Sequence, residues 1–234
     1  MTELVWDGCV NVRDVGGLVR ADNIPFLSDE GWQALVDHGV TRVIDLRFPV
    51  EREEDVPRDA PVEVVHISLL GEGHAAEWED EFAAVMDRSA SAEEYLVFAY
   101  LEFLERYPQR FARVFEAIAD APAGAVVVHC FGGKDRTGLV IALALRLAGQ
   151  SLDAVAADYA RTESNLAQRH ARWIGEAPDE TERRRRELLG PAPAGAMRRV
   201  VEELESRHGS VEEYLRGGGL SDAAIVSVRK RLQD

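Results

Sequence analysis

One stretch of the sequence, residues 126–138 (VVVHCFGGKDRTG), limits the possible folds more than any other, because it puts a cysteine between a strand and a helix. Residues 126–128 are all valine, a β-branched run typical of a buried strand, and residues 139–148 are apolar nearly all round, as in a buried helix. Cys130 therefore lies in a turn that ends at a helix N-terminus, where unpaired amides and aligned peptide dipoles give partial positive charge. Such a turn predicts a phosphate-binding loop.

The loop also contains the residues that phosphoryl chemistry needs. A cysteine that titrates at about 8.5 in isolation drops to roughly 3.5–7.5 beside a helix N-terminus and a cation, so we expect Cys130 to be largely thiolate at neutral pH. Arg136 has a planar fork of donors that can grip two phosphoryl oxygens. Gly132 and Gly133 permit positive φ and let successive amides turn inward. We expect Thr137 to donate its hydroxyl to the sulfur.

The whole loop is expected to surround the phosphate with amides and side chains. Its members are Phe131, Gly132, Gly133, Lys134, Asp135 and Arg136. Lys134 is one of only two lysines in the chain, the other being Lys230, and it adds positive charge for an anionic substrate.

Residues 129–138 resemble the HCxxGKDRTG signature of the bacterial atypical tyrosine phosphatases, a family that also accepts phosphoserine and phosphoinositide substrates. Further segments are similar to elements of that family and follow in its order: residues 11–17 (NVRDVGG), 43–47 (VIDLR) and 209–222, which contains GSVEEYL and LSD. One departure is Ala21, where the family usually has a serine within a longer segment. The resemblance implies a cysteine-phosphatase-like α/β sandwich with a helical lid.

Loop chemistry and resemblance together predict a phosphatase for phosphate monoesters. The Cys130 thiolate attacks phosphorus, and water then hydrolyses the phosphocysteine, while Arg136 and the loop amides stabilise the oxygens. The proton donor for the leaving oxygen is open, because the chain has no Trp-Pro-Asp loop. Asp135 in the loop is the first candidate, Asp45 at a strand end the second and Asp14 the third.

Other residues near these motifs are expected to support the loop. His129 should hydrogen-bond to the backbone and fix the turn, with a role as base the minor alternative. Arg13 and Asp14 are expected to pair with each other and brace the loop. Cys9 fits a small buried hydrophobe, and only proximity to Cys130 would make it a redox partner.

Composition narrows the remaining choices. Residues 1–234, with 46% hydrophobic content, suit a single domain, and a net charge of −15 disfavours nucleic-acid binding. Two cysteines give no disulfide framework and no signal peptide is apparent, so we expect a cytoplasmic protein. The helix after the loop is too short to insert into a bilayer. No metal-ligand spacing appears, and the reaction requires no cofactor.

The periodicity of the chain predicts a largely parallel sheet flanked by helices, with the loop at the carboxyl end of a strand. The expected elements are a hairpin at 10–19, strands at 40–46, 62–69 and 126–128, and helices at 28–38, 109–119, 139–148, 152–161, 165–172, 193–208 and 221–232. Residues 71–107 form two aromatic-rich helices, either a lid over the pocket or ordinary core helices.

Two rival functions use the same cysteine. One is a catalytically idle module that binds phosphorylated partners, although such proteins usually lose the cysteine or the arginine. The other is a cysteine-loop enzyme of arsenate-reductase or rhodanese type. A reductase needs resolving cysteines, and a sulfurtransferase lacks the Lys-Asp-Arg-Thr pattern. For a phosphatase, the partner is a phosphorylated protein or a phosphoinositide, and the sequence does not choose between them or define an oligomeric state.

Overall fold

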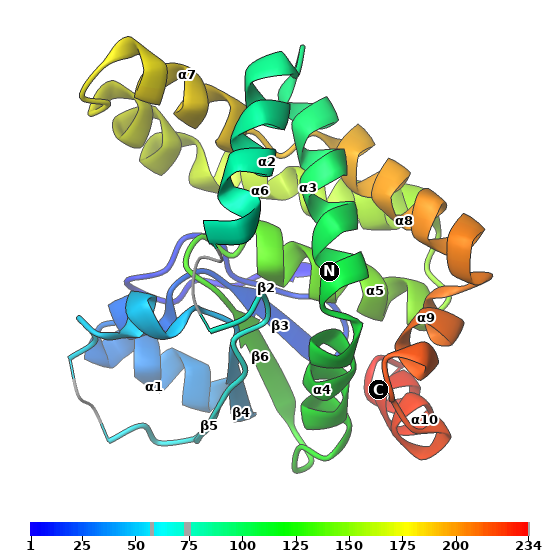
Figure 1. The fold of residues 1–234 in the computed structure, drawn as a ribbon. Helices are drawn as coiled ribbons and strands as arrows, with labels where there is room; N and C mark the ends of the chain where they lie inside the picture. The colour runs from blue at the N-terminus through cyan, green and yellow to red at the C-terminus, as the bar shows by residue number, and fades with distance from the viewer. Residues whose placement is uncertain (57–58, 73–75, 234) are drawn as a thin grey trace.

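A computed structural model describes residues 1–56, 59–72 and 76–233, and this part of the chain is an α/β structure (Figure 1). Its strands form one sheet in the order β1-β2-β3-β6-β4-β5. The strand bounds are β1 Thr2–Glu3, β2 Arg13–Asp14, β3 Leu18–Ala21, β4 Val40–Asp45, β5 Glu63–His66 and β6 Ala125–His129. Strands β3, β6, β4 and β5 run parallel, and β1 and β2 are added antiparallel at one edge. The predicted α/β class with a mostly parallel sheet is confirmed.

Helices surround this sheet and extend beyond its carboxyl edge. Their bounds are α1 Asp29–Asp37, α2 Ala76–Arg88, α3 Ala92–Arg106, α4 Pro108–Ala119, α5 Asp135–Leu147, α6 Leu152–Gly175, α7 Glu180–Leu189, α8 Ala194–His208, α9 Val211–Gly217 and α10 Asp222–Arg231, with short 3-10 turns η1 Ile24–Phe26 and η2 Pro49–Arg52. Figure 1 shows α2, α3 and α7 standing above the sheet, on the side where β6 ends.

Strand β6 is buried on both faces, as the all-valine run predicts. Val126 and Val128 pack into the larger core, with α4 and α5, whereas Val127 packs into a smaller core with Trp32 and Leu35 of α1. Because side chains alternate along a strand, consecutive residues at the end of β6 also face opposite sides. His129 therefore lies on the α1 side and Cys130 on the larger-core side.

Helix α6 differs from the sequence prediction, which divided it into two helices. The segment between the predicted halves, residues 162–164, contains no proline or glycine, so nothing ends the helix there. Thr162 and Leu166 continue one buried face, and the Ser164 hydroxyl donates to the carbonyl of Arg161 at 2.9 Å. Helices α7 and α9 were not among the predicted elements.

Two helices occur in the region proposed as a lid. Phe82 of α2 packs against Phe98 and Phe103 of α3, with ring centroids 5.3 and 5.5 Å apart. Residues 73–75 of this region lie outside the described residues. The aromatic cluster joins α2 to α3, and Tyr95 and Tyr100 of α3 are buried in the main core.

Candidate active site

The cysteine loop connects the end of β6 to the start of α5, at the carboxyl edge of the sheet. Cys130 and Lys134 are buried, while the Phe131 side chain is 50% exposed and meets Phe26 edge-on. Among the residues that the structure describes, none accepts a hydrogen bond from the amides of residues 131–134. These amides are therefore available to donate to an oxyanion.

Only one of the two adjacent glycines has a backbone conformation and surroundings that require glycine. Gly133 has a φ of +64°, and a Cβ there would lie 2.5 Å from the carbonyl oxygen of Ala21. Gly132 does not have a positive φ, and a Cβ at that position would lie 4.0 Å from its nearest neighbour, a methyl carbon of Leu166. The loop thus presses against the end of β3 at Gly133 alone.

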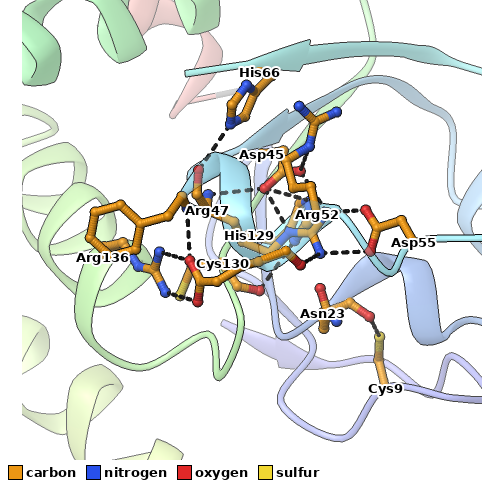
Figure 2. Close-up of polar contacts among 12 residues, drawn as sticks. Cys9, Asn23, Asp45, Arg47, Arg52, Asp55, His66, His129, Cys130 and Arg136 are labelled. Atoms are coloured by element: carbon orange, nitrogen blue, oxygen red, sulfur yellow. Dashed lines mark hydrogen bonds and ion pairs between the residues drawn. The ribbon is translucent and has the colours of Figure 1, made fainter. Parts of the chain in front are cut away.

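Arg136 forms a two-pronged ion pair that was not predicted from the sequence (Figure 2). Its Nη2 donates to Oε1 of Glu51 at 2.8 Å, and its Nη1 donates to Oε2. Burial opposes the charge on Arg136, but Glu51 and the charge of Cys130 outweigh it and raise the pKa of the guanidinium. The same guanidinium lies 5.0 Å from the ring centre of Phe48. The arginine is therefore fully charged and oriented before any substrate arrives.

The Lys134 side chain bonds to the C-terminal end of α7 and the residues just after it. Its Nζ donates to the carbonyl oxygens of Leu189 and Pro191, the second at 3.2 Å. Leu189 is the last residue of α7, where the helix dipole favours a positive charge, and Pro191 follows the helix. Lys134 also lies 3.3 Å from Oδ1 of Asp135. In this structure Lys134 joins the end of α7 to the loop through these hydrogen bonds.

Asp135 is joined to the helices above the loop. Tyr100 of α3 donates to its Oδ1 at 2.5 Å, and the hydroxyls of Tyr100 and Tyr159 of α6 are 2.7 Å apart. Both tyrosines are fully buried, whereas the Asp135 side chain is 43% exposed. Among described residues, no partner bonds to Oδ2 of Asp135, so this oxygen is open to a substrate.

Asp45 lies in a different environment, on the α1 side of the sheet. Arg47 donates to both of its oxygens, at 3.0 and 2.8 Å, and Arg52 pairs with it at 3.1 Å (Figure 2). Burial would raise the pKa of Asp45, but Arg47 and His129 outweigh burial and hold it well below its usual range. A cavity of about 870 Å³ on this side is lined by Asp45 and His129 but not by Cys130. This setting suits a permanent carboxylate.

His129 bonds to the backbone, as expected. Its Nδ1 lies 3.2 Å from the carbonyl oxygen of Cys130, and its own carbonyl accepts from the amide of Leu46 at 2.9 Å. Burial lowers the pKa of His129 to about 4, so the ring is neutral at pH 7. The backbone carbonyl thus joins the end of β6 to the residue after β4, while the neutral ring contacts the carbonyl of Cys130.

The expected pair between Arg13 and Asp14 does not form, because neighbours on a strand point to opposite faces. Asp14 accepts from the amide of Gly16 at 2.7 Å and lies 3.1 Å from Nε2 of His38, at the amino end of the parallel strands. Arg13 instead donates to Asp158 of α6 at 2.7 Å.

Two further expectations about polar side chains differ from the structure. The Thr137 hydroxyl is buried and makes no hydrogen bond to any described residue, so the expected bond to the sulfur is absent. Cys9 is half-buried and donates to the carbonyl of Asn23 at 3.5 Å. Figure 2 shows Cys9 and Cys130 on opposite sides of the group of residues drawn.

The roles of several residues at the site were not predicted from the sequence, because these residues come from distant segments. They are Glu51 in η2, Tyr100 in α3, Tyr159, Asp158 and Thr162 in α6, and Asn11 and Arg20 near the N-terminus. Asn11 belongs to a segment that the sequence singled out, without a role. The described residues contain no group of three His, Cys, Asp or Glu side chains able to hold a metal ion. Within the described ranges, no helix has the length and apolarity needed to cross a membrane.

Comparison with known proteins identifies the family of this chain. Residues 4–234 match the model of the tyrosine phosphatase family. The chain is 29% identical over 248 residues to a tyrosine-protein phosphatase of Nostoc commune, an alignment that covers 99% of this chain and 76% of the relative. It is 28% identical over 268 residues to the triple specificity protein phosphatase PtpB of Mycobacterium tuberculosis, covering 95% and 96% of the two chains. This chain therefore belongs to the tyrosine phosphatase family, hydrolases that act on phosphorylated substrates.

Proposed function

We propose that this phosphatase works through a phosphocysteine on Cys130. Its sulfur attacks phosphorus, the bond from phosphorus to the ester oxygen breaks, and that oxygen leaves with a proton. Water then attacks the phosphocysteine, the S–P bond breaks, and inorganic phosphate and the thiolate are released. The observation that best supports this is a buried cysteine and a charged arginine on one loop whose amides have no acceptor among the described residues.

Asp135 is our proposed proton donor in the first step. Its free Oδ2 can carry the proton while Oδ1 is fixed by Tyr100. Asp45 fits the role less well. Burial would raise its pKa, but Arg47 outweighs burial and holds the pKa low, whereas a general acid must hold a proton at the working pH.

The proposed substrates are phosphotyrosine, phosphoserine or phosphothreonine and phosphoinositides, a range supported by the relative with triple specificity. The exposed, edge-on pair of Phe26 and Phe131 beside the loop suits an aryl or lipid leaving group. We further propose that residues 71–107 act as a lid within a single domain of residues 1–234, since Tyr100 of α3 bonds directly to Asp135. The two free cysteines suit a reducing, cytoplasmic location.

Specificity constants for the three substrate classes, measured side by side, test this function. We expect turnover of each, abolished in Cys130→Ser and retained in the matched Cys9→Ser variant. Phosphate binding without turnover in the natural chain would indicate an idle binding module. Turnover that survives in Cys130→Ser would overturn the proposed nucleophile.

Hydrogen exchange tests the lid. We expect phosphate to slow exchange in α2 and α3 relative to β6. Exchange in these helices that is as slow as in β6 and indifferent to phosphate would refute the lid.

A further inference from the structure

Side chains from the N-terminal hairpin donate hydrogen bonds to carbonyl groups of the phosphate loop. Asn11 donates through Nδ2 to the carbonyl oxygens of Gly132 and Gly133, at 3.3 and 3.2 Å. Arg20 donates through Nη2 to the same Gly133 oxygen at 2.5 Å. Asn11 and Arg20 are both completely buried, so these bonds are shielded from water.

These bonds fix the direction of the loop amides. In a trans peptide, the carbonyl and the N–H of the next residue point in opposite directions. When the oxygens of Gly132 and Gly133 are turned toward Asn11, the amides of Gly133 and Lys134 are turned away from it. No described residue accepts from those two amides. They are therefore directed away from Asn11 and stay unbonded within the described part of the chain.

A second set of contacts orients the side chains of Asn11 and Arg20. Arg13 donates to Oδ1 of Asn11 at 2.7 Å, which orients the amide so that its nitrogen faces the loop. Asp158 of α6 accepts from Arg13 at 2.7 Å and from Arg20 at 2.5 Å. Thr162, one turn further along α6, accepts from Arg20 at 3.1 Å. This series of hydrogen bonds thus joins α6 to the loop through two arginines and one asparagine.

The charges in this cluster do not cancel. Burial is the main cause that lowers the pKa of Arg13, to about 10, so it remains protonated at pH 7. Burial would raise the pKa of Asp158, but Arg20 and Arg13 outweigh it and lower the pKa, so the carboxylate is ionised. The guanidinium groups of Arg13 and Arg20 thus face the single carboxylate of Asp158. A net positive charge behind the loop favours a bound phosphate.

We propose that Asn11 and Arg20 are positioning residues for the phosphate site, which hold the Gly132 and Gly133 carbonyls back so that the loop amides face the substrate. This inference rests on the proposed function, since it assigns these amides to the phosphate of the substrate. It gives a role to the N-terminal segment that includes residues 11–17, more than a hundred residues away from the loop in the chain.

Phosphate binding in a Cys130→Ser background tests the proposal without turnover. Asn11→Ala removes both donated bonds, and we expect the Kd of inorganic phosphate to rise roughly 10-fold, the effect of losing about 1.4 kcal/mol of binding free energy. Arg20→Lys keeps the charge but loses the fork that spans Asp158 and Gly133, so it should weaken binding in the same direction. In amide NMR spectra, phosphate should shift the Gly133 and Lys134 signals in the parent protein and much less in either variant.

Tyr214→Phe is the matched control, because it deletes a buried hydrogen bond to the carbonyl of Leu104, 2.8 Å long, without touching the loop. The proposal is overturned if Asn11→Ala and Arg20→Lys bind phosphate as tightly as this control and retain the Gly133 and Lys134 shifts. Normal phosphate binding with no hydrolysis by the natural chain would instead refute the proposed function and leave the positioning role intact.

Discussion

Glu51 grips both terminal nitrogens of Arg136, with Oε1 2.8 Å from Nη2 and Oε2 bonded to Nη1. The amide of Phe48 donates to Oε2 of the same carboxylate at 2.7 Å, so η2 fixes the carboxylate and the carboxylate fixes the arginine. The Nε of Arg136 has no acceptor among the described residues. That edge of the guanidinium is available to a phosphate.

Glu51→Gln should lower kcat/KM about 10-fold, because a charge-assisted bond that orients Arg136 becomes a weaker neutral one, a loss of about 1.4 kcal/mol in the transition state. Steady-state kinetics on an aryl phosphate measures it. Glu53→Gln, an exposed change two residues further on, is the control and should have no effect. A rise in kcat/KM would show that the carboxylate mainly repels the substrate.

Asp135→Asn should slow hydrolysis of phosphoserine by about 100-fold or more and of an activated aryl phosphate far less, because only the poor leaving group needs a proton. Comparison of kcat for the two substrates provides the measurement. Asp14→Asn, at the amino end of the sheet, serves as the matched change. Equal slowing of both substrates by Asp135→Asn would point to Asp45 or water as the donor.

Lys134→Met should release the end of α7, because the bonds to Leu189 and Pro191 are lost. We expect faster amide exchange across α7 and little change in phosphate affinity. Lys230→Met removes the other lysine, which is exposed on α10, and should alter neither quantity. If Lys134→Met weakens phosphate binding strongly while α7 exchange is unchanged, the lysine acts on the substrate instead.

His129 makes stability depend on pH in a defined window. Burial lowers its folded-state pKa from 6.5 to about 4, so the unfolded chain takes up the extra proton first as the pH falls. The stability associated with the neutral ring is complete above about pH 6.5 and is lost toward pH 4, a loss of roughly 3 kcal/mol. The free energy of unfolding in urea should be measured for the natural chain and for His129→Gln. The difference between the two free energies should change by this amount between pH 7 and pH 4. A difference that stays constant would show that His129 titrates normally.

The sequence predicted the elements whose signals are local. The all-valine run before Cys130 defined β6, the Ser28 side chain caps α1 by accepting from Gly31 at 3.1 Å, and Gly16 and Gly17 adopt the positive φ that their hairpin turn needs. In each case the responsible residues are neighbours in the chain, so their pattern is visible without a structure.

Contacts between distant segments were not predictable in this way. Glu51 and Arg136 are 85 residues apart, and Arg13 and Asp158 are 145 apart. No local pattern sets how the N-terminal strands meet α6, so Arg13 was paired with its neighbour Asp14, although adjacent strand residues face opposite sides. The bonds from Lys134 to Leu189 and Pro191 were not predicted for a similar reason, because α7 was not among the predicted elements.

The contact between Cys9 and the carbonyl of Asn23 has a practical consequence for chemical labelling. Burial, followed by the nearby charge of Asp22, raises the pKa of the Cys9 thiol far above neutrality. A protonated thiol reacts slowly with electrophiles. A small anionic reagent such as iodoacetate should therefore modify the natural chain at a single sulfur, and a spectroscopic reporter can be attached in the phosphate loop without first removing the second cysteine.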